Sequence, residues 1–345
     1  DDLRKGLSSI ETYAKPERVF ALNNCSVSLV GDDVQGIADQ MDLPWPVYAM
    51  DSGGMKGSFE AGYSASSLRI EKEMKTKEKI PASVNVLGLS TVHMKGREDA
   101  EEIRRLLSLC GIRVISMPGG GSNWEDIMDA PSASLNIVVR DELGLSLAKQ
   151  MERDFGTPYM SCGFPYGTDG TVAWLSEIIE KLGAGELTRA SHEAAKLKEF
   201  LLRKGNNLES LWGPLWFDAV LISAPPSEAL GIAEAIRSEW IDTARLCIHA
   251  QCETEKSTPA ADAIRVVMKN EKEIAKDYED WQGGLVLSSS HETHLFRRMG
   301  RSFTGFHIAL PSHDEVHFSD LPQCGLRGAG YLYEQLWNAK LRKQR

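Results

Sequence analysis

The sequence predicts an α/β protein made of three consecutive Rossmann-like parallel-sheet units. Short runs rich in β-branched and apolar residues alternate with segments of helical periodicity, a pattern typical of parallel βαβ units. The chain has 345 residues, and at roughly 150 residues per domain this length favours two or three domains. Hydrophobic residues make up 42% and charged residues 26%, as in ordinary globular proteins.

The first predicted unit covers residues 1–80. Apolar runs bounded by polar segments indicate its strands, and apolar side chains recurring on one face indicate its longer helix. The charged segment Lys75–Pro81 ends in proline and is taken as the boundary. The predicted strands are Val19–Leu22 and Val47–Met50, and the predicted helices are Val34–Met41 and one within Phe59–Lys75.

The second predicted unit covers residues 81–212. Its last helix is expected to end before Gly205–Asn207, because glycine and asparagine favour turns. Its strands are predicted at Ser83–Leu89, Arg113–Met117, Leu135–Val139 and Pro158–Ser161, and its helices at Glu98–Leu109, Leu143–Phe155, Val172–Leu182 and Ala190–Arg203.

The third predicted unit covers residues 213–345 and ends in a helix. Its strands are predicted at Phe217–Ser223, Ala244–Ala250, Leu285–Ser288 and Phe303–Leu310. Its helices are predicted at Ser227–Glu239, Ala260–Asp280, Glu292–Met299 and Gly328–Leu341.

Charge and hydropathy exclude two classes of partner. With 39 Lys plus Arg against 49 Asp plus Glu, the net charge is −10, which argues against nucleic-acid binding. No apolar run approaches the roughly 18 residues of a membrane span, so no membrane partner is expected. The sequence starts at Asp1 without methionine or a signal peptide, so either it was processed or an N-terminal segment precedes it.

Six cysteines are spread along the chain without a C-x-x-C pair. This spacing is not a disulfide framework, so a reducing, cytoplasmic location is expected. Cys110 and Cys247 lie in apolar segments and are predicted to be buried hydrophobic side chains. The other four lie at or near predicted strand ends and loops, where ligands are more common: Cys25, Cys162, Cys252 and Cys324.

A glycine-rich turn follows one predicted strand, where ligands bind in parallel sheets. It contains Gly119, Gly120 and Gly121, and Ser122 with Glu125 predicts a capping box at a helix start that could hold an anion. The alternative is a tight turn that needs positive φ. The contiguous glycines match neither a P-loop nor G-x-G-x-x-G, so no nicotinamide cofactor is expected.

Five of the eight histidines lie in the last 55 residues. His291-Glu-Thr-His294 and His313-Asp-Glu-Val-His317 approach H-E-x-x-H but do not match it. Two interpretations stay open: polar histidines lining a cavity, or a mononuclear zinc site, which needs three or four ligands. There is no G-x-S-x-G elbow, so a serine hydrolase is not expected.

Several segments, in order from about residue 3 to residue 338, resemble the nitrogenase component 1-like oxidoreductase family. That family includes the molybdenum–iron protein subunits, cofactor-assembly scaffolds, dark-operative protochlorophyllide reductase and nickel-sirohydrochlorin reductive cyclase. The segments that carry the resemblance are Lys15–Asp33, Asp51–Tyr63, Ala130–Val139, Phe155–Tyr159, Pro165–Thr171 and Pro311–Asn338.

The resemblance implies three Rossmann-like domains around a central cleft, a metallocluster near a subunit interface and an ATP-hydrolysing iron protein as electron donor. Cys25 stands where the family has a cysteine that ligates an iron–sulfur cluster, and [4Fe–4S] clusters typically take four cysteines. The family's other ligands come from a more N-terminal segment. We therefore expect the sequence to begin partway into its first unit, with an incomplete ligand set. A second component 1-like subunit, identical or different, is the expected partner.

One departure concerns the position after the strand Leu135–Val139. The nitrogenase catalytic subunit has a cofactor cysteine there, and this chain has Arg140. A cation does not ligate iron, so iron–molybdenum cofactor bound in that manner is not expected. Arg140 is predicted to bind an acidic group, such as a tetrapyrrole carboxylate. The alternative is an ion pair with Asp141, Glu142 or a neighbour.

Three functions are compatible with these observations. The first is an oxidoreductase subunit that receives low-potential electrons from an iron protein and reduces a substrate or bound cofactor in the cleft. The second is a non-catalytic scaffold that holds a metallocofactor during assembly. The third, outside the family, is a metal-free α/β ligand-binding protein or sugar-nucleotide transferase. For the first, the assigned residues are Cys25 as cluster ligand, Gly119, Gly120, Gly121 and Arg140 for an anionic group, and His291, His307 and His313 as proton donors.

Overall fold

The computed structural model describes residues 2–250, 263–266, 278–279, 281 and 283–343. The chain forms two compact units, residues 1–73 and 74–345. The described strands form three sheets, and every strand pair in them is parallel. The predicted α/β class with parallel sheets is therefore confirmed, while the division into three domains stays a prediction.

The first unit contains one two-stranded sheet and four helices. Its core is built around Leu7, Ala38, Trp45 and Val47. The helix at Cys25–Val30 was expected to be a loop. It forms because the Asn24 side chain accepts a hydrogen bond from Val27 N–H at its start. The elements are α1 (Asp2–Ile10), β1 (Val19–Leu22), α2 (Cys25–Val30), α3 (Val34–Asp39), β2 (Val47–Met50) and α4 (Phe59–Glu71).

The second unit begins with a four-stranded sheet of order β4-β3-β5-β6. The order reverses between β3 and β5, which makes their carboxyl ends a topological switch point. The strands are β3 (Ile80–Leu87), β4 (Arg113–Ser116), β5 (Ala133–Val138) and β6 (Tyr159–Ser161). The helices are α5 (Gly96–Leu109), α6 (Trp124–Asp129), the 3-10 turn η1 (Ala130–Ser132), α7 (Asp141–Phe155), α8 (Thr168–Leu182) and α9 (Thr188–Trp212).

The second unit continues with a five-stranded sheet of order β11-β10-β7-β8-β9, whose switch point lies between β7 and β10. The strands are β7 (Trp216–Ala224), β8 (Asp242–Ala250), β9 (Ala263–Val266), β10 (Leu285–Ser288) and β11 (Thr304–His307). The helices are α10 (Pro226–Ala235), the π-helical turn η2 (Ile236–Trp240), α12 (Ser290–Arg298) and α13 (Gly325–Lys343).

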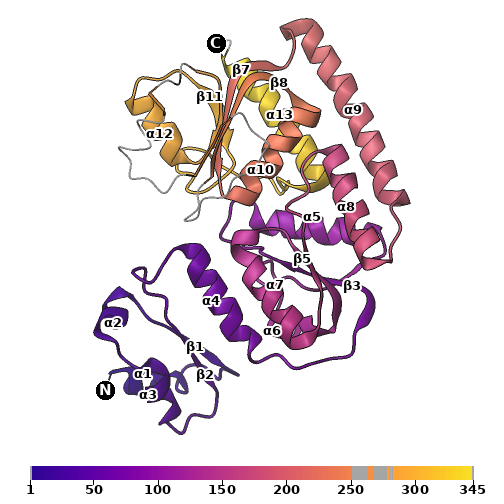
Figure 1. The fold of residues 1–345 in the computed structure, drawn as a ribbon. Coiled ribbons are helices and arrows are strands. Elements are labelled where there is room, and N and C mark those ends of the chain that lie inside the picture. Colours follow the sequence, from indigo (N-terminus) through magenta and orange to yellow (C-terminus); the bar gives the residue numbers. More distant parts are fainter. Residues whose placement is uncertain (1, 251–262, 267–277, 280, 282, 344–345) are drawn as a thin grey trace. The chain divides into compact units, whose positions relative to one another are not determined.

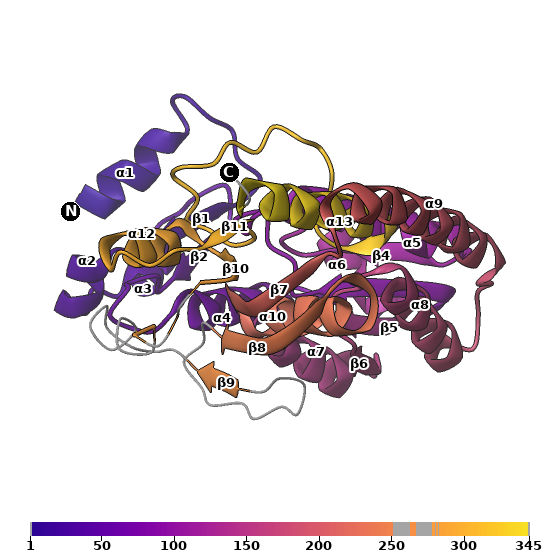
Figure 2. The same cartoon turned by 90° about the horizontal axis from the view of Figure 1, so that it is seen from above.

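The largest core of the second unit lies between its two sheets, where α5, α8, α10 and α13 are sandwiched (Figures 1 and 2). Val86 and Ile137 from one sheet and Val220 and Ile222 from the other belong to this single cluster. The outer faces are covered by α7 and α12, which bury smaller clusters. The two Rossmann-like halves therefore share one core, which explains why residues 74–345 form one unit.

Tertiary contacts override two of the predictions. The helix expected to end before Gly205 continues to Trp212. A Cβ at Gly205 would lie 2.3 Å from the Tyr333 hydroxyl of α13, so the glycine permits close helix packing rather than a turn. The helix predicted at Ala260–Asp280 is wrong at residues 263–266, which form β9 beside β8. The rest of that segment, except 278 and 279, lies outside the described residues, as does Cys252. No helix in the described part of the chain is long and apolar enough to cross a bilayer.

Two glycines of α13 differ in the space beside them and provide a matched test of the packing. A Cβ at Gly328 would lie 2.3 Å from the Gln323 backbone, whereas one at Gly330 would meet Leu197 at 3.8 Å. We expect Gly328→Ala to lower the free energy of unfolding by about 1–3 kcal/mol, as overpacked sites do. Gly330→Ala should leave it unchanged or raise it by up to about 1 kcal/mol through helix propensity. Denaturant unfolding measures both, and equal effects would contradict the described packing.

Candidate functional site

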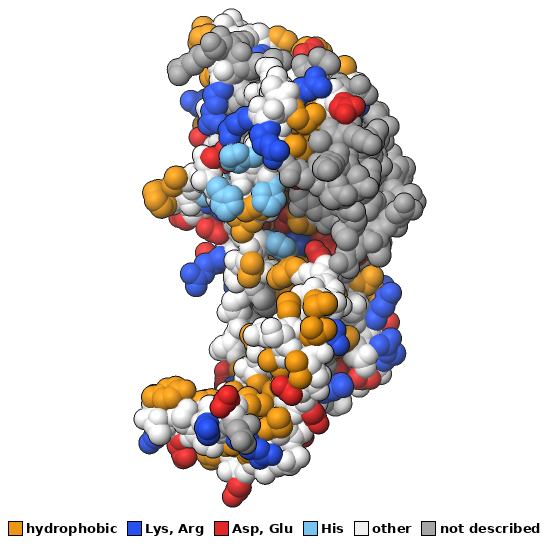
Figure 3. All heavy atoms as spheres, turned by 90° about the vertical axis from the view of Figure 1, so that its left-hand side faces the viewer, with side chains coloured by type: hydrophobic (Ala, Val, Ile, Leu, Met, Phe, Trp, Pro, Cys, Tyr) orange, Lys and Arg blue, Asp and Glu red, His pale blue; other side chains and the backbone are white. Residues whose placement is uncertain are grey.

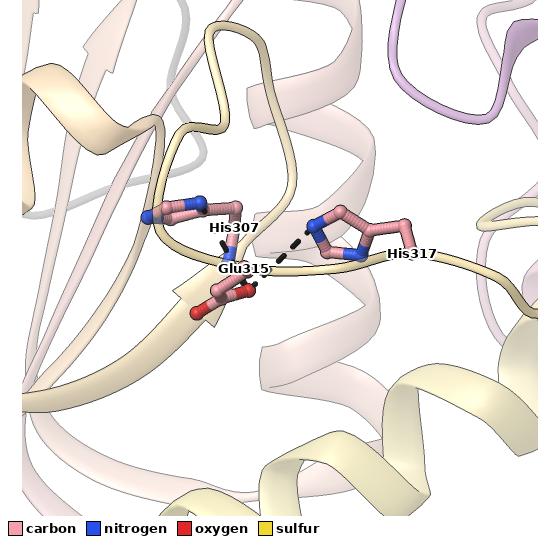
Figure 4. Close-up of side chains that lie close together, drawn as sticks. All are labelled: His307, Glu315 and His317. Atoms are coloured by element: carbon pink, nitrogen blue, oxygen red, sulfur yellow. Dashed lines mark hydrogen bonds and ion pairs between the residues drawn. The ribbon is translucent and has the colours of Figure 1, made fainter.

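A cluster of histidine and carboxylate side chains lies at the carboxyl end of β11. His307 is the last residue of β11 and only 1% exposed. The irregular segment that follows returns past it and carries Ser312, Glu315 and His317 (Figure 4). The start of that segment is held to α12, because the backbone and hydroxyl of Ser290 donate to the Pro311 carbonyl, each at 2.8 Å.

Polar atoms of four side chains converge in this cluster. His307 Nδ1 lies 3.9 Å from Glu315 Oε2, and His317 Nε2 lies 3.8 Å from the same oxygen. The Ser312 hydroxyl lies between the two rings, 2.7 Å from His307 Nδ1 and 3.1 Å from His317 Nε2. Glu315 is fixed further by the His307 backbone N–H, which donates to Oε2 at 2.9 Å. The arrangement can hold a cation or relay a proton through Ser312.

The other side of the His307 ring faces a second set of partners. Asp314 Oδ1 and Thr293 Oγ1 each lie 3.4 Å from His307 Nε2. Asp314 also pairs with Arg297 of α12. Burial favours a raised pKa for Asp314, but the hydrogen bond from Arg297 and the proximity of His307 outweigh it, so this pKa is lowered. An ionised Asp314 favours a proton on His307 Nε2 and leaves Nδ1 as the acceptor.

His317 is the more accessible of the two rings, with 21% of its side chain exposed. Burial lowers its pKa, Glu315 opposes the shift, and Lys95 and His307 add to it. A lowered pKa keeps the imidazole neutral at pH 7, the form that accepts a proton or a metal ion.

Next to this cluster, the switch point between β7 and β10 is filled by the protein's own side chains. Glu292 of α12 accepts a hydrogen bond from Ser223 at 3.0 Å, and its other oxygen accepts from the Ser289 backbone at 3.1 Å. Ser289 and Glu292 form the capping box of α12. These three residues are buried. A structural cap therefore occupies the place where a ligand would be expected in this sheet type.

The predicted proton donors are placed differently from one another. His307 is buried in the cluster, while His291 on α12 and His313 in the following segment are exposed. Figure 3 shows histidine side chains gathered on one face, with Lys and Arg side chains beside them. The structure does not bring His291 or His313 within the group of candidate metal ligands found in the described residues.

The glycine loop differs in detail from the expected cap. The capping box is formed by Asn123 and Asp126, one residue later than predicted, because the Ser122 hydroxyl instead accepts from the Met117 backbone N–H. Gly119 has φ +74° and Gly121 has φ +99°, so the loop needs glycine for its tight turn. Anion binding by Gly119–Gly121 stays a prediction.

Arg140 is fully buried between the two halves of the second unit. Its Nε donates to Glu228 Oε1 at 3.0 Å, and its Nη1 donates to the Gly88 carbonyl at 3.1 Å. The guanidinium also lies over the Phe164 ring at 4.3 Å. The ion-pair alternative therefore describes this conformation, with Glu228 of α10 as partner instead of Asp141 or Glu142. A guanidinium enclosed in this way does not present its donors to an external carboxylate.

These sites lie on a fold for which the comparisons with known proteins are decisive. The family model for nitrogenase component 1 type oxidoreductases matches residues 1–341. The chain belongs to this family.

Curated relatives and solved structures of the nitrogenase component 1 type agree. The chain is 30% identical over 213 residues to the nitrogenase iron–molybdenum cofactor biosynthesis protein NifE of Clostridium pasteurianum, covering 60% of this chain and 44% of NifE. It is 23% identical to a subunit of the light-independent protochlorophyllide reductase of Chlorobium phaeobacteroides, covering 98% and 68%. A structure of nitrogenase Cp1 at pH 6.5 superposes with a TM-score of 0.76 at 16% identity, covering 99% of this chain and 79% of that one. The chain thus spans about half to two thirds of these curated relatives.

Members of the nitrogenase component 1 family bind metal–sulfur clusters, so the fit of Cys25 to such a cluster matters. Cys25 is exposed as the first residue of α2, and the Gly54 backbone N–H donates to its sulfur at 3.2 Å. Hydrogen bonds of this kind tune cluster thiolates. Cys25 is also the sole cysteine in the sequence of residues 1–73. The first unit therefore fits one ligand of a cluster and does not hold a four-cysteine cluster by itself.

The described cysteines of the second unit have the features of core residues. Cys110 and Cys247 are buried, as predicted. Burial raises the pKa of Cys110, raises that of Cys162 to about 12 and raises that of Cys324 well above its usual value. A raised pKa disfavours the thiolate that ligates metal, which leaves Cys25 as the better candidate among the described cysteines.

Sequence reasoning missed part of the histidine cluster. It noticed His317 but placed it in an H-x-x-x-H helical spacing, whereas residues 313–317 are not helical. In extended chain, side chains two apart lie on one side, so Glu315 and His317 were the pair to consider. Ser312 and Asp314 carried no signal in the sequence.

The Arg140–Glu228 pair provides a test of how the two halves are joined. Replacing Glu228 by Gln leaves a buried guanidinium without a countercharge, so we expect a loss of about 3 kcal/mol in unfolding free energy. The matched control is Asp169→Asn, which removes an exposed pair with Lys198 and should cost less than about 1 kcal/mol. Thermal and denaturant unfolding of the whole chain measure both. Similar small losses would show that the Arg140 pair is dispensable.

Asp99 provides a pH-dependent test of the same interface. Burial raises its pKa to about 7, although the Cys324 and Gln323 backbone N–H groups and Arg140 act in the opposite direction. The folded state then binds a proton that the unfolded chain has lost above about pH 4. Wild-type stability, measured relative to Asp99→Asn, should fall between about pH 4 and 7 by at most about 1.4 kcal/mol per pH unit. A relative stability that rises over this range would contradict the assignment.

Proposed function

We propose that this chain is a nitrogenase-like oxidoreductase component. It accepts low-potential electrons from an ATP-hydrolysing iron protein-like partner and reduces a substrate or a metallocofactor. The observation that carries this proposal is the family match over residues 1–341. The likeness to the protochlorophyllide reductase subunit along 98% of the chain favours a catalytic member.

Cys25 is assigned to an iron–sulfur cluster completed by a second component 1-like subunit. Its exposure at the start of α2 allows a ligand to be shared across a subunit interface. When bound, such a cluster supplies single-electron transfer at low potential. The chain itself contributes one thiolate, oriented by the N–H···S hydrogen bond from Gly54.

The other assigned residues are given roles that their burial allows. The exposed His291 and His313 are placed to exchange protons with water and a substrate. His307 is buried, and it would exchange protons through the Ser312 hydroxyl, 2.7 Å from its Nδ1. The Gly119–Gly121 loop stays the proposed anion site. Arg140 positions the two halves through Glu228 instead of touching substrate.

A metallocofactor-assembly scaffold is the second candidate. The likeness to NifE, at 30% identity over 60% of this chain, favours it specifically. A scaffold needs the same thiolate and the same fold, but it releases its metallocofactor to another protein and carries out no catalytic turnover.

One anaerobic experiment tests these functions together. The protein in its native assembly is analysed for iron, sulfide and EPR signals, and is then mixed with an iron protein, ATP and reductant. We expect a cluster that Cys25→Ala removes and that the matched variant Cys162→Ala, a buried thiol, retains. ATP-dependent turnover supports the enzyme, and transfer of the chromophore to another protein without turnover supports the scaffold. Protein without iron, unchanged by Cys25→Ala, overturns both and favours a metal-free binding protein.

A further inference from the structure

We propose that His307, Glu315 and His317 form a mononuclear site for a divalent transition cation of the Zn²⁺ type. The site belongs to the second unit and involves no cysteine, so it is independent of the cluster proposed at Cys25. It gives His307 a ligand role in place of proton exchange through Ser312.

The separations between the donor atoms are close to those of a coordination sphere. One atom from each residue lies within 4.8 Å of the other two. Two of the pairs are 3.9 and 3.8 Å apart, while ligands of a tetrahedral zinc ion at about 2.0–2.1 Å are separated by about 3.3 Å. His307 is anchored in β11, whereas Glu315 and His317 lie on an irregular segment with about a quarter of their side chains exposed. Rotations of these two side chains by a few tenths of an ångström at the donor atoms close the difference.

The donor chemistry selects the class of cation. Two imidazole nitrogens and one carboxylate oxygen suit Zn²⁺ and neighbouring transition metals, whereas Ca²⁺ and Mg²⁺ prefer oxygen alone. Metal-ligating histidines usually donate their other ring N–H to a carboxylate. Asp314 Oδ1, 3.4 Å from His307 Nε2, is placed to accept that N–H. Three protein ligands leave a fourth position open for water or a substrate atom.

Ser312 defines the competing explanation. Its hydroxyl lies near the same two nitrogens, His307 Nδ1 and His317 Nε2. Without metal, it satisfies both rings in a hydrogen-bonded relay. A serine side chain leaves this place by one rotation about χ1, so a cation can replace it. Removing the hydroxyl therefore separates the two explanations.

The test uses the full chain, stripped of metal and titrated with Co²⁺, whose visible absorption reports a tetrahedral nitrogen and oxygen site. We expect one equivalent to bind and Zn²⁺ to displace it. Glu315→Gln and His317→Gln should abolish the absorption. Asp314→Asn should weaken binding by about tenfold to about 100-fold, as changes in outer partners do. Ser312→Ala should retain or strengthen binding.

Matched controls exclude binding elsewhere. His294→Gln and His313→Gln alter exposed histidines of the same region, and Cys25→Ala alters the proposed cluster ligand. All three should keep the Co²⁺ absorption and the one-equivalent stoichiometry. Circular dichroism confirms that each variant is folded, which matters most for His307→Gln because His307 is buried.

Three results would overturn the site. They are no specific Co²⁺ absorption in the wild type, retention of binding by the Glu315 and His317 variants, and loss of binding in the His294, His313 or Cys25 controls. Because the readout is metal content and absorption, failure here leaves the redox experiment on Cys25 unaffected.

Discussion

The buried ion pair between Arg140 and Glu228 is the interaction on which the second unit depends. Arg140 follows β5 of one sheet, and Glu228 belongs to α10, which packs on the other sheet. A buried guanidinium requires a countercharge and hydrogen-bond acceptors, because the desolvation penalty is otherwise several kcal/mol. Glu228 and the Gly88 carbonyl supply them. The relative placement of the two sheets is thereby tied to one charged side chain.

A second polar link fixes the C-terminal helix to the same region. Asp99 of α5 accepts from the backbone N–H groups of Gln323 and Cys324, at 2.7 and 3.0 Å. These residues directly precede α13, which packs in the core between the sheets. The segment from β11 to α13, which carries the histidine cluster, is thus held at both ends: by His307 in β11 and by Asp99 before α13. The cluster keeps its surroundings because the polar links around it are buried.

The sequence was sufficient for most strands and insufficient for contacts between distant segments. Val19–Leu22, Val47–Met50 and Leu285–Ser288 have the predicted bounds, because short apolar runs between polar segments report burial directly. Gly205 and the segment around β9 misled, since helix packing and strand pairing there override local preference. At the candidate site, His307 could be nominated from its place at a strand end. Glu228 could not be identified as the partner of Arg140, because it lies 88 residues away in the chain.

The location of the histidine cluster follows from what fills the expected ligand positions. Parallel sheets bind ligands at their switch points, but in the described structure these places hold internal side chains. Arg140 covers the Gly88 carbonyl at one switch point, and Glu292 with Ser223 fills the other. The N-terminus of α8, a further anion-binding position, is capped by Glu239, which accepts from the Thr168 and Gly170 backbones at 2.6 and 3.0 Å. Ligand chemistry in this unit is therefore displaced one strand from the switch point, to the end of β11. There His307 is buried, while Glu315 and His317 are partly open to solvent.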